Sequence, residues 1–215
     1  MKLVLHNYWR SSASHRVRIA LGLKELAYEY VVVNIVKHDQ FADAYRARNP
    51  MSQVPALEIT EDDGSITTLS QSLPIIEYLE ERFPEKPVLP KGLVARARAR
   101  ALAEIVNSGI QPLQNLSTTK AVKKLGGDEA VWPQAFIANG LAAYAALAAE
   151  TAGAFSVGDA PTIADCCLIP QLASARRFGV DYAQHTVLAK IERNCMELDA
   201  FKSAMPDQQP DAVRT

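Results

Sequence analysis

The chain has 215 residues, of which 48% are hydrophobic and 22% are charged, and its formal net charge at pH 7 is −1. A chain of this length can bury one large core or two smaller ones. The nearly balanced charge excludes the broad basic field that attracts nucleic acids or acidic membranes, so we expect neither as a partner.

The first half of the chain alternates between strand and helix patterns. β-branched, aromatic and apolar runs predict strands over 2–8, 28–36, 54–59 and 66–69. Helical spacing predicts helices that include 17–23, 40–48 and 71–79. The order β-α-β-α-β-β-α predicts an α/β domain with a small mixed sheet covered by helices on both faces, which is the thioredoxin-like arrangement. Redox members of that fold carry a Cys-x-x-Cys motif at the position of residues 11–14. That segment contains no cysteine in this chain, which excludes dithiol exchange at that position.

The second half is helical and rich in alanine. Its pattern predicts helices near 93–122 with a kink at Pro112, and at 129–150, 162–178 and 186–201. Thr162 and Asp165 fit a capping box at the start of one of them. From Pro206 onward the chain is polar, which predicts a loosely held end. We therefore predict a thioredoxin-like domain over 1–83, a proline-rich linker over 84–92 and an all-helical bundle domain over 93–215.

Cysteine usage and the N-terminal pattern predict the compartment. Cys166, Cys167 and Cys195 form neither a Cys-x-x-Cys motif nor a disulfide framework, and we expect no metal site. The chain starts directly on a strand pattern, without the apolar core of a signal peptide. No segment approaches the roughly 20 apolar residues of a membrane span. We therefore expect a cytoplasmic protein.

The junction between the opening strand and the first helix suits an anion. The segment 10–16 contains three serines and two arginines. A helix N-terminus presents unpaired N–H groups and a partial positive charge. Serine hydroxyls there can also donate to a thiolate or an oxyanion. The alternative role for Ser11, Ser12 and Ser14 is simple helix capping.

Motifs along nearly the full length resemble the zeta class of glutathione transferases, whose best-known activity is maleylacetoacetate isomerisation. These motifs are Ser11–Leu21, Asn49–Pro55, Gln71–Ser72, Gly109–Ser117, and Val157–Asp159 leading to Ala164–Asp165. The resemblance implies a glutathione transferase architecture, glutathione as the cofactor and a homodimer.

The resemblance also implies which residues contact the sulfur end of glutathione. Ser11 would support the cysteinyl sulfur, with Ser12 and Ala13 beside it. Many family members have a cysteine where this chain has Ala13, so the nucleophilic sulfur here would come from glutathione. Val54, preceding what would be a cis proline at Pro55, would pair its backbone with the cysteinyl unit.

The rest of the implied cradle is spread over both halves of the chain. Gln71 and Ser72 are implied to contact the γ-glutamyl end, and Gln40 is implied to contact the glycyl end. From the helical half, the implied contacts are Gln111, Asn115 and Ser117.

Cis–trans isomerisation needs a temporary loss of the double bond, by addition and elimination of the glutathione thiolate. The protein must lower the pKa of the thiol and stabilise the enolate that addition creates. Ser11 and Ser12, with the neighbouring N–H groups, suit the first task. Arg10, together with Arg176 or Arg177, suits the second task and can pair with substrate carboxylates.

The leading hypothesis is a glutathione-dependent enzyme that converts maleylacetoacetate to fumarylacetoacetate in tyrosine and phenylalanine catabolism. One alternative is a maleylpyruvate isomerase of gentisate degradation. A second is a general glutathione transferase or peroxidase, which would turn over simple aromatic halides with little need for Arg10 or Arg177. A third is a non-enzymatic glutathione-binding module, in which Ser11→Ala would change no activity.

Overall fold

The computed structural model describes residues 1–213 and contains two compact units. One unit comprises Met1–Pro87 and the segment that begins at Leu198, and the other comprises Val88–Glu197. The sequence places a linker at 84–92 and assigns everything after it to the helical domain. The structure instead groups the start of that linker and the C-terminal segment with the first unit.

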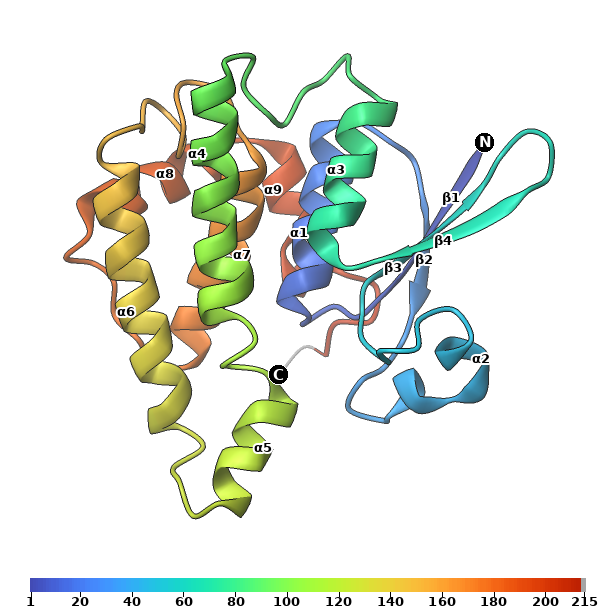
Figure 1. Ribbon diagram of the computed structural model, residues 1–215, viewed down its shortest axis with the longest axis horizontal. Coiled ribbons are helices and arrows are strands. Elements are labelled where there is room, and N and C mark those ends of the chain that lie inside the picture. Colours follow the sequence, from blue (N-terminus) through green and yellow to red (C-terminus); the bar gives the residue numbers. More distant parts are fainter. Residues whose placement is uncertain (214–215) are drawn as a thin grey trace. The chain divides into compact units, whose positions relative to one another are not determined.

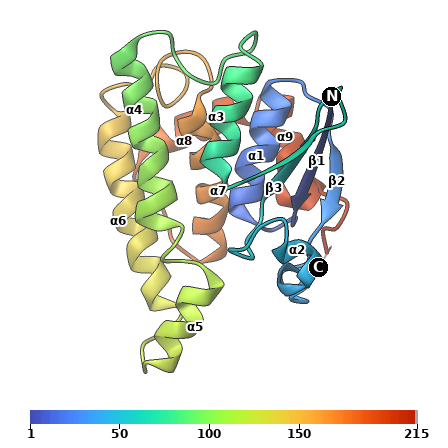
Figure 2. The same cartoon turned by 45° about the vertical axis from the view of Figure 1, so that its right-hand side comes forward.

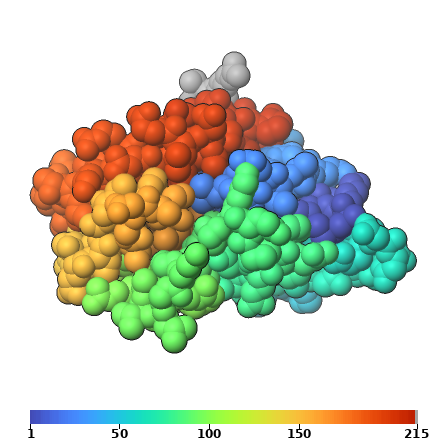
Figure 3. All heavy atoms as spheres, turned by 90° about the horizontal axis from the view of Figure 1, so that it is seen from above, coloured from blue at the N-terminus to red at the C-terminus, as the bar shows by residue number. Residues whose placement is uncertain are grey.

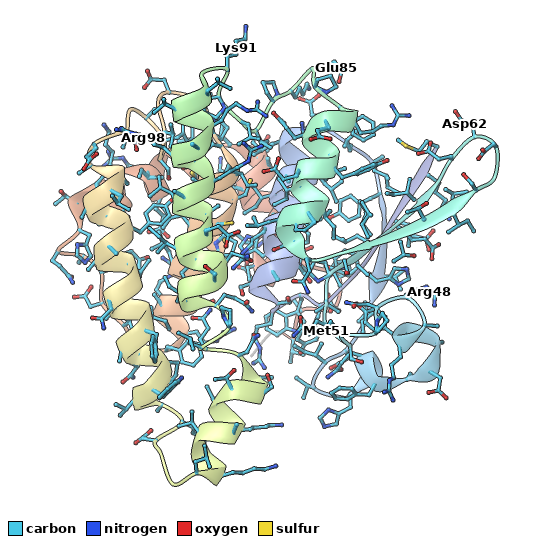
Figure 4. The ribbon with its side chains drawn as sticks, viewed as in Figure 1. Arg48, Met51, Asp62, Glu85, Lys91 and Arg98 are labelled. Atoms are coloured by element: carbon cyan, nitrogen blue, oxygen red, sulfur yellow. The ribbon has the colours of Figure 1, made fainter. Side chains whose placement is uncertain are left out.

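The first unit is built on a four-stranded sheet in the order β2–β1–β3–β4. The strands are β1 (Lys2–Asn7), β2 (Glu29–Val32), β3 (Ala56–Thr60) and β4 (Ile66–Ser70). β1 pairs parallel with β2 and antiparallel with β3, and β3 pairs antiparallel with β4. The mixed sheet confirms the thioredoxin-like prediction. In Figure 3 the β3–β4 hairpin lies at one margin of this unit, and Figure 4 places Asp62 at its tip.

Helices pack on the sheet of the first unit. α1 (Ser12–Leu23) and α3 (Ser72–Arg82) lie side by side, and α9 (Asp199–Ala204) packs against α1 (Figures 1 and 2). A Cβ on Gly22 would lie 3.1 Å from the Cα of Ala200, so the small residue allows the close approach of α1 and α9. A short 3₁₀ turn (Asp39–Phe41) precedes α2 (Asp43–Arg46), whose Tyr45 ring contacts His6 of β1.

The second unit is built from helices. They are α4 (Leu93–Glu104), a π-helical turn (Ile105–Ile110), α5 (Leu116–Lys124), α6 (Val131–Ala148), α7 (Ile163–Arg177) and α8 (Thr186–Cys195). α7 is the most buried of them, and the capping box of Thr162 and Asp165 at its start is present as predicted. Within residues 1–213, no helix has the length and apolar character needed to cross a membrane.

The end of the chain differs from the prediction of a loose segment. Pro206–Gln208 form a 3₁₀ turn, and Gln209 is 8% exposed. The Gln209 amide donates to the carbonyls of Ser203 and Met205, at 2.7 and 2.8 Å. Asp211 accepts hydrogen bonds from the backbone N–H of Trp9 and the hydroxyl of Tyr30, both in the first unit. The prediction is wrong as far as Asp211, because hydrogen bonds of polar side chains hold the segment up to that residue.

Candidate functional site

The N-terminus of α1 places the serines of the opening motif. Ser11 is the N-cap residue, and its Oγ accepts the N–H of Ser14 at 3.2 Å. Ser12 and Ala13 follow in the first turn, where N–H groups have no acceptor within the helix. That turn contains no acidic residue to offset its partial positive charge. Ser11 therefore does cap the helix, and because it accepts through a lone pair its own proton remains available to another acceptor.

The N-terminus of α3 is a second helix start that carries a serine, and a buried arginine side chain contacts that serine. Gln71 is the N-cap residue at φ 70°, and Ser72 is the first helical residue and only 3% exposed. Nη1 of Arg16, a residue 1% exposed on α1, donates to Oγ of Ser72 at 3.1 Å. A positive φ at a residue other than glycine costs on the order of 1–2 kcal/mol, so the surrounding structure must fix Gln71. The first turn of α3 also lacks acidic residues, which leaves this end attractive to an anion.

The segment before β3 carries the predicted cis peptide bond. The Val54–Pro55 bond is cis, as the family resemblance implied. The carbonyl of Gln53 accepts the hydroxyl of Tyr45 at 2.6 Å and the side-chain amide of Asn49 at 2.7 Å. Figure 4 shows Arg48 and Met51 on the same stretch of chain. Two donors on one carbonyl hold the backbone directly before Val54 in place.

Gln40 has an unsatisfied acceptor. It lies in the 3₁₀ turn before α2 and is 9% exposed. Its Nε2 makes a long hydrogen bond of 3.5 Å to the carbonyl of Ile35, and its buried Oε1 has no hydrogen-bond partner in the described part of the chain. A buried acceptor without a partner costs about 1–3 kcal/mol. Such a group is suited to a ligand that brings its own donor.

Arg10 and His15 lie on either side of the capping serine in sequence. Arg10 is exposed, and its guanidinium lies 5.7 Å from the centre of the Trp9 ring. His15 is 1% exposed. Burial, with a smaller contribution from the charge of Arg18, holds the pKa of His15 well below its ordinary value. His15 is therefore neutral at pH 7 and closed to solvent, which suits packing better than general-base chemistry.

In the second unit, the predicted polar contacts gather around the turn before α5. Gln111 donates its side-chain amide to Oδ1 of Asn115 at 2.8 Å, and Asn115 is the N-cap residue of α5. Ser117 is exposed in the first turn of that helix. Gln114 and Gln171 exchange two buried amide hydrogen bonds of 3.1 and 3.0 Å, which tie this turn to α7.

The pairing of Gln114 with Gln171 does not follow from any local sequence pattern. Gln171 stands in an apolar, buried run of α7, where a polar amide requires a partner. An isolated glutamine in an apolar run therefore indicates a buried hydrogen bond, but the sequence does not identify Gln114 as its partner.

The two arginines at the end of α7 differ in their surroundings. Arg176 forms an ion pair with Glu192 at 2.6 Å and also hydrogen-bonds the hydroxyl of Tyr182. The Arg177 guanidinium lies 5.1 Å from the centre of the Phe178 ring. Arg176 is thus tied to α8 through Glu192.

The predicted site residues therefore fall into two groups. In the first unit, the Arg16–Ser72 hydrogen bond joins the N-termini of α1 and α3. A side-chain contact of 3.5 Å between Gln71 and Gln53 links the segment before β3 to the start of α3. The second unit carries the predicted residues 111, 115, 117, 176 and 177. Two helix N-termini, a fixed extended segment and an unpaired amide oxygen fit a peptide-like anion. Within residues 1–213, no cluster of three or more His, Cys, Asp or Glu is arranged to hold a metal ion.

Comparisons with known proteins agree with this geometry. The family model of the glutathione S-transferase N-terminal domain matches residues 5–87. A maleylpyruvate isomerase of Ralstonia sp is 44% identical over 97% of this chain and 99% of the relative, and a zeta-class glutathione S-transferase of Euphorbia esula is 44% identical over 99% and 93%. The crystal structure of maleylacetoacetate isomerase from Anaeromyxobacter dehalogenans 2CP-1, with GSH bound in its active site, has a TM-score of 0.91 at 51% identity and covers 99% of this chain and 98% of that one. The similarity thus extends through both compact units.

Proposed function

The chain belongs to the family of zeta-class glutathione transferases and maleylacetoacetate isomerases, and from this premise we propose that it isomerises maleylacetoacetate to fumarylacetoacetate with glutathione, in tyrosine and phenylalanine catabolism. The observation that carries the proposal is the N-terminus of α1. There Ser11 caps the helix and keeps a proton to donate, while Ala13 supplies no protein thiol. The sulfur that reacts must then belong to the cofactor.

The first unit offers a group for each end of glutathione. Ser11 and Ser12, with the free N–H groups of the first turn, would hold the sulfur as a thiolate. Gln71 and Ser72 would hold the γ-glutamyl carboxylate at the N-terminus of α3. The unpaired Oε1 of Gln40 would accept the amide N–H of the glycyl unit.

The cysteinyl backbone and the second unit would complete the cradle. The backbone of Val54, before the cis bond to Pro55, would pair with the cysteinyl unit. The predicted contributions of the second unit are the polar side chains of Gln111, Asn115 and Ser117. The hydrogen bond between Gln111 and Asn115 supports their acting together.

When bound, glutathione supplies the thiolate that adds to the cis double bond and leaves after rotation about the resulting single bond. The protein's part is to lower the pKa of that thiol and to stabilise negative charge on the substrate. Arg10 and Arg177 are proposed to pair with the substrate carboxylates and to stabilise the enolate oxygen. Arg176 stays a candidate for the same contact, with Glu192 fixing the position of its guanidinium.

We propose a homodimer in a reducing, cytoplasmic compartment, with the thioredoxin-like unit binding glutathione and the helical unit binding the dicarboxylate. Family membership supports the dimer. Three free, buried cysteines in the described chain fit a reducing compartment.

A second candidate substrate is maleylpyruvate. The observation that favours it is the Ralstonia relative, a maleylpyruvate isomerase 44% identical to this chain. Both substrates present carboxylates to the same arginines, so the proposed site accepts either. Their relative kcat/KM values would identify the preferred one.

The test is to measure loss of each cis substrate with glutathione, without it, and with S-methylglutathione, which lacks a free thiol. We expect conversion only with glutathione. Ser11→Ala should lower kcat for both substrates by about 10²-fold, because one donor to a developing negative charge is lost. Ser65→Ala, an exposed serine in the β3–β4 turn, is the control and should leave kcat unchanged.

Arg177→Ala should mainly raise KM, because a uniform carboxylate contact contributes to binding more than to turnover. Arg193→Ala on α8 is its control, since it removes an exposed arginine of the same unit. Glutathione-independent conversion, or no conversion of either maleyl compound alongside rapid turnover of aromatic halides, would overturn the assignment.

A further inference from the structure

The loop that leads to Ser11 is held by the C-terminal segment. The backbone N–H of Trp9 donates to Oδ2 of Asp211 at 3.1 Å, across 202 residues of sequence. The carbonyl of Trp9 accepts from Nη2 of Arg18 at 3.1 Å. Both polar atoms of the Trp9 backbone are therefore fixed, one of them directly by the end of the chain.

Arg18 links the same loop to α9. Its Nε and Nη2 donate to the carbonyl of Ala204 at 3.2 and 3.1 Å, while its Nη1 donates to Oδ1 of Asn7 at 3.0 Å. Arg18 is 2% exposed, and burial lowers its pKa to about 10, so it stays charged at neutral pH. The carbonyl of Trp9 is thus also linked to the C-terminal segment, through the guanidinium of Arg18.

The carboxylate of Asp211 is itself anchored to the sheet. Its Oδ1 accepts the hydroxyl of Tyr30, from β2, at 2.5 Å. Burial first, and then the hydrogen bond to Asp211, raise the pKa of Tyr30, so this hydroxyl keeps its proton and donates at neutral pH. Asp211 therefore joins β2 to the loop between β1 and α1.

That loop carries the groups proposed to act on the thiol and the substrate. Arg10 follows Trp9 directly, and the N–H of Ser11 donates to the carbonyl of Tyr8 at 3.0 Å. Fixing the Trp9 backbone fixes where the Arg10 side chain leaves the chain and how Ser11 enters α1. Misplacement of a reacting group by about 1 Å can cost about 10²-fold in rate, so such anchoring matters for turnover.

We propose that Asp211 is a positioning residue for the glutathione site, holding the Trp9 loop so that Ser11 and Arg10 meet their ligands. This inference rests on the proposed glutathione chemistry. It assigns a role in the active site to a segment that the sequence alone marks as a loose end.

The experiment compares Asp211→Ala, Asp211→Asn and Tyr30→Phe with Asp207→Asn, which removes an exposed carboxylate four residues away. In ligand-free protein, hydrogen–deuterium exchange of the segment around Trp9 should be about tenfold faster in Asp211→Ala, because local opening no longer breaks the Asp211 bond. Asp211→Asn, which keeps one acceptor, should give an intermediate rate, and Tyr30→Phe a smaller increase. Asp207→Asn should match the wild type.

The second readout is the pKa of the bound glutathione thiol, followed by the ultraviolet absorbance of the thiolate. In Asp211→Ala this pKa should rise toward that of free glutathione, and kcat should fall about tenfold with a smaller change in the KM for glutathione. A general loss of stability would lower the folded fraction without moving this pKa. If Asp211→Ala does not fold, Asp211→Asn and Tyr30→Phe provide the same two readouts.

The outcomes separate the two proposals. If the wild type does not lower the pKa of bound glutathione, the proposed function fails. If the wild type lowers it and the Asp211 variants and Tyr30→Phe match Asp207→Asn in both exchange and thiol pKa, the role of Asp211 is overturned while the proposed function stands.

Discussion

The bond between Arg16 and Ser72 illustrates how a buried cation can direct a neighbouring hydroxyl. Ser72 accepts from the guanidinium at 3.1 Å, so its own proton must point to another acceptor. The N-terminus of α3 lies beside it, and both features favour a carboxylate. At the residue scale, Ser72 is therefore prepared as a donor before any ligand arrives.

Removing this hydroxyl should weaken glutathione binding. We expect Ser72→Ala to raise the dissociation constant of S-methylglutathione about tenfold or more, since a hydrogen bond to a charged group contributes about 1.5–3 kcal/mol. Isothermal titration calorimetry measures this directly. Arg16→Lys should weaken binding in the wild type and add little in the Ser72→Ala background, because it acts through Ser72. Equal losses in both backgrounds would show that Arg16 acts independently.

His15 should make stability depend on pH. Burial holds its pKa in the folded state well below the ordinary value of 6.5, so the unfolded chain binds more protons below that pH. The free energy of unfolding should therefore fall as the pH drops below about 6.5, with a limiting slope of about 1.4 kcal/mol per pH unit from this one group. His15→Phe should remove that part of the slope in urea denaturation measured between pH 7 and pH 5.

The control for this measurement is His38→Asn. His38 is exposed and adopts a φ of 67°, a conformation that asparagine tolerates. Its variant should keep the wild-type slope. A slope that stays unchanged in His15→Phe would mean that another group, such as His6, whose pKa burial also lowers, sets the acid sensitivity.

At the element scale, Lys24 joins the end of α1 to the end of α3. Its side chain is 0% exposed, and Nζ donates to Glu80 at 2.8 Å and to the carbonyls of Phe83 and Lys86 at 2.8 and 3.0 Å. All three protons of the ammonium are thereby used. Phe83 is the C-cap residue of α3, so the lysine satisfies a carbonyl that the helix leaves without a donor.

Lys24→Met should reduce the free energy of unfolding by about 3–5 kcal/mol, because it leaves the Glu80 carboxylate buried beside unpaired carbonyls. Lys86→Met is the matched control, since it removes an ion pair with Glu25 in which both side chains are solvent-accessible and which contributes at most about 1 kcal/mol. Denaturant unfolding of both variants gives the comparison. Equal losses would show that the buried pair contributes no more than a surface pair.

Several helices were predictable from the sequence, but only some of their interruptions were. The capping box at the start of α7 follows from residues three apart, so a local pattern reveals it. The predicted helix over 93–122 is interrupted near Pro112, as expected, but it also passes through a π-helical turn that was not predicted, and Gln114 then turns toward Gln171. The predicted helix over 186–201 is divided into α8 and α9, which belong to different units. Both differences depend on partners that are distant in sequence.

The same distinction holds for the candidate site. The serines at the start of α1 were singled out because a helix start is visible in sequence, whereas the Gln71–Ser72 pair was assigned from the family resemblance. Arg16, Gln171 and Asp211 were not assigned these partners, since each acts on a residue at least 50 positions away. The sequence thus singled out residues at helix starts but not the distant partners that hold them.

At the scale of the whole molecule, the two compact units do not follow the order of the chain. The first unit begins at Met1, is interrupted after Pro87 and resumes at Leu198. α9 packs against α1, and Asp211 is bonded to the loop before it. A boundary drawn at the linker would therefore cut the first unit from part of its own structure.

This interrupted order has a consequence for how the protein is made. A nascent chain that has left the ribosome only as far as Glu197 contains every strand of the sheet but lacks α9 and the carboxylate that holds the Trp9 loop. The second unit, being continuous in sequence, can form before the first unit is complete. During synthesis, the proposed glutathione site of the first unit should thus be among the last parts of the protein to mature, although most of its residues are translated first.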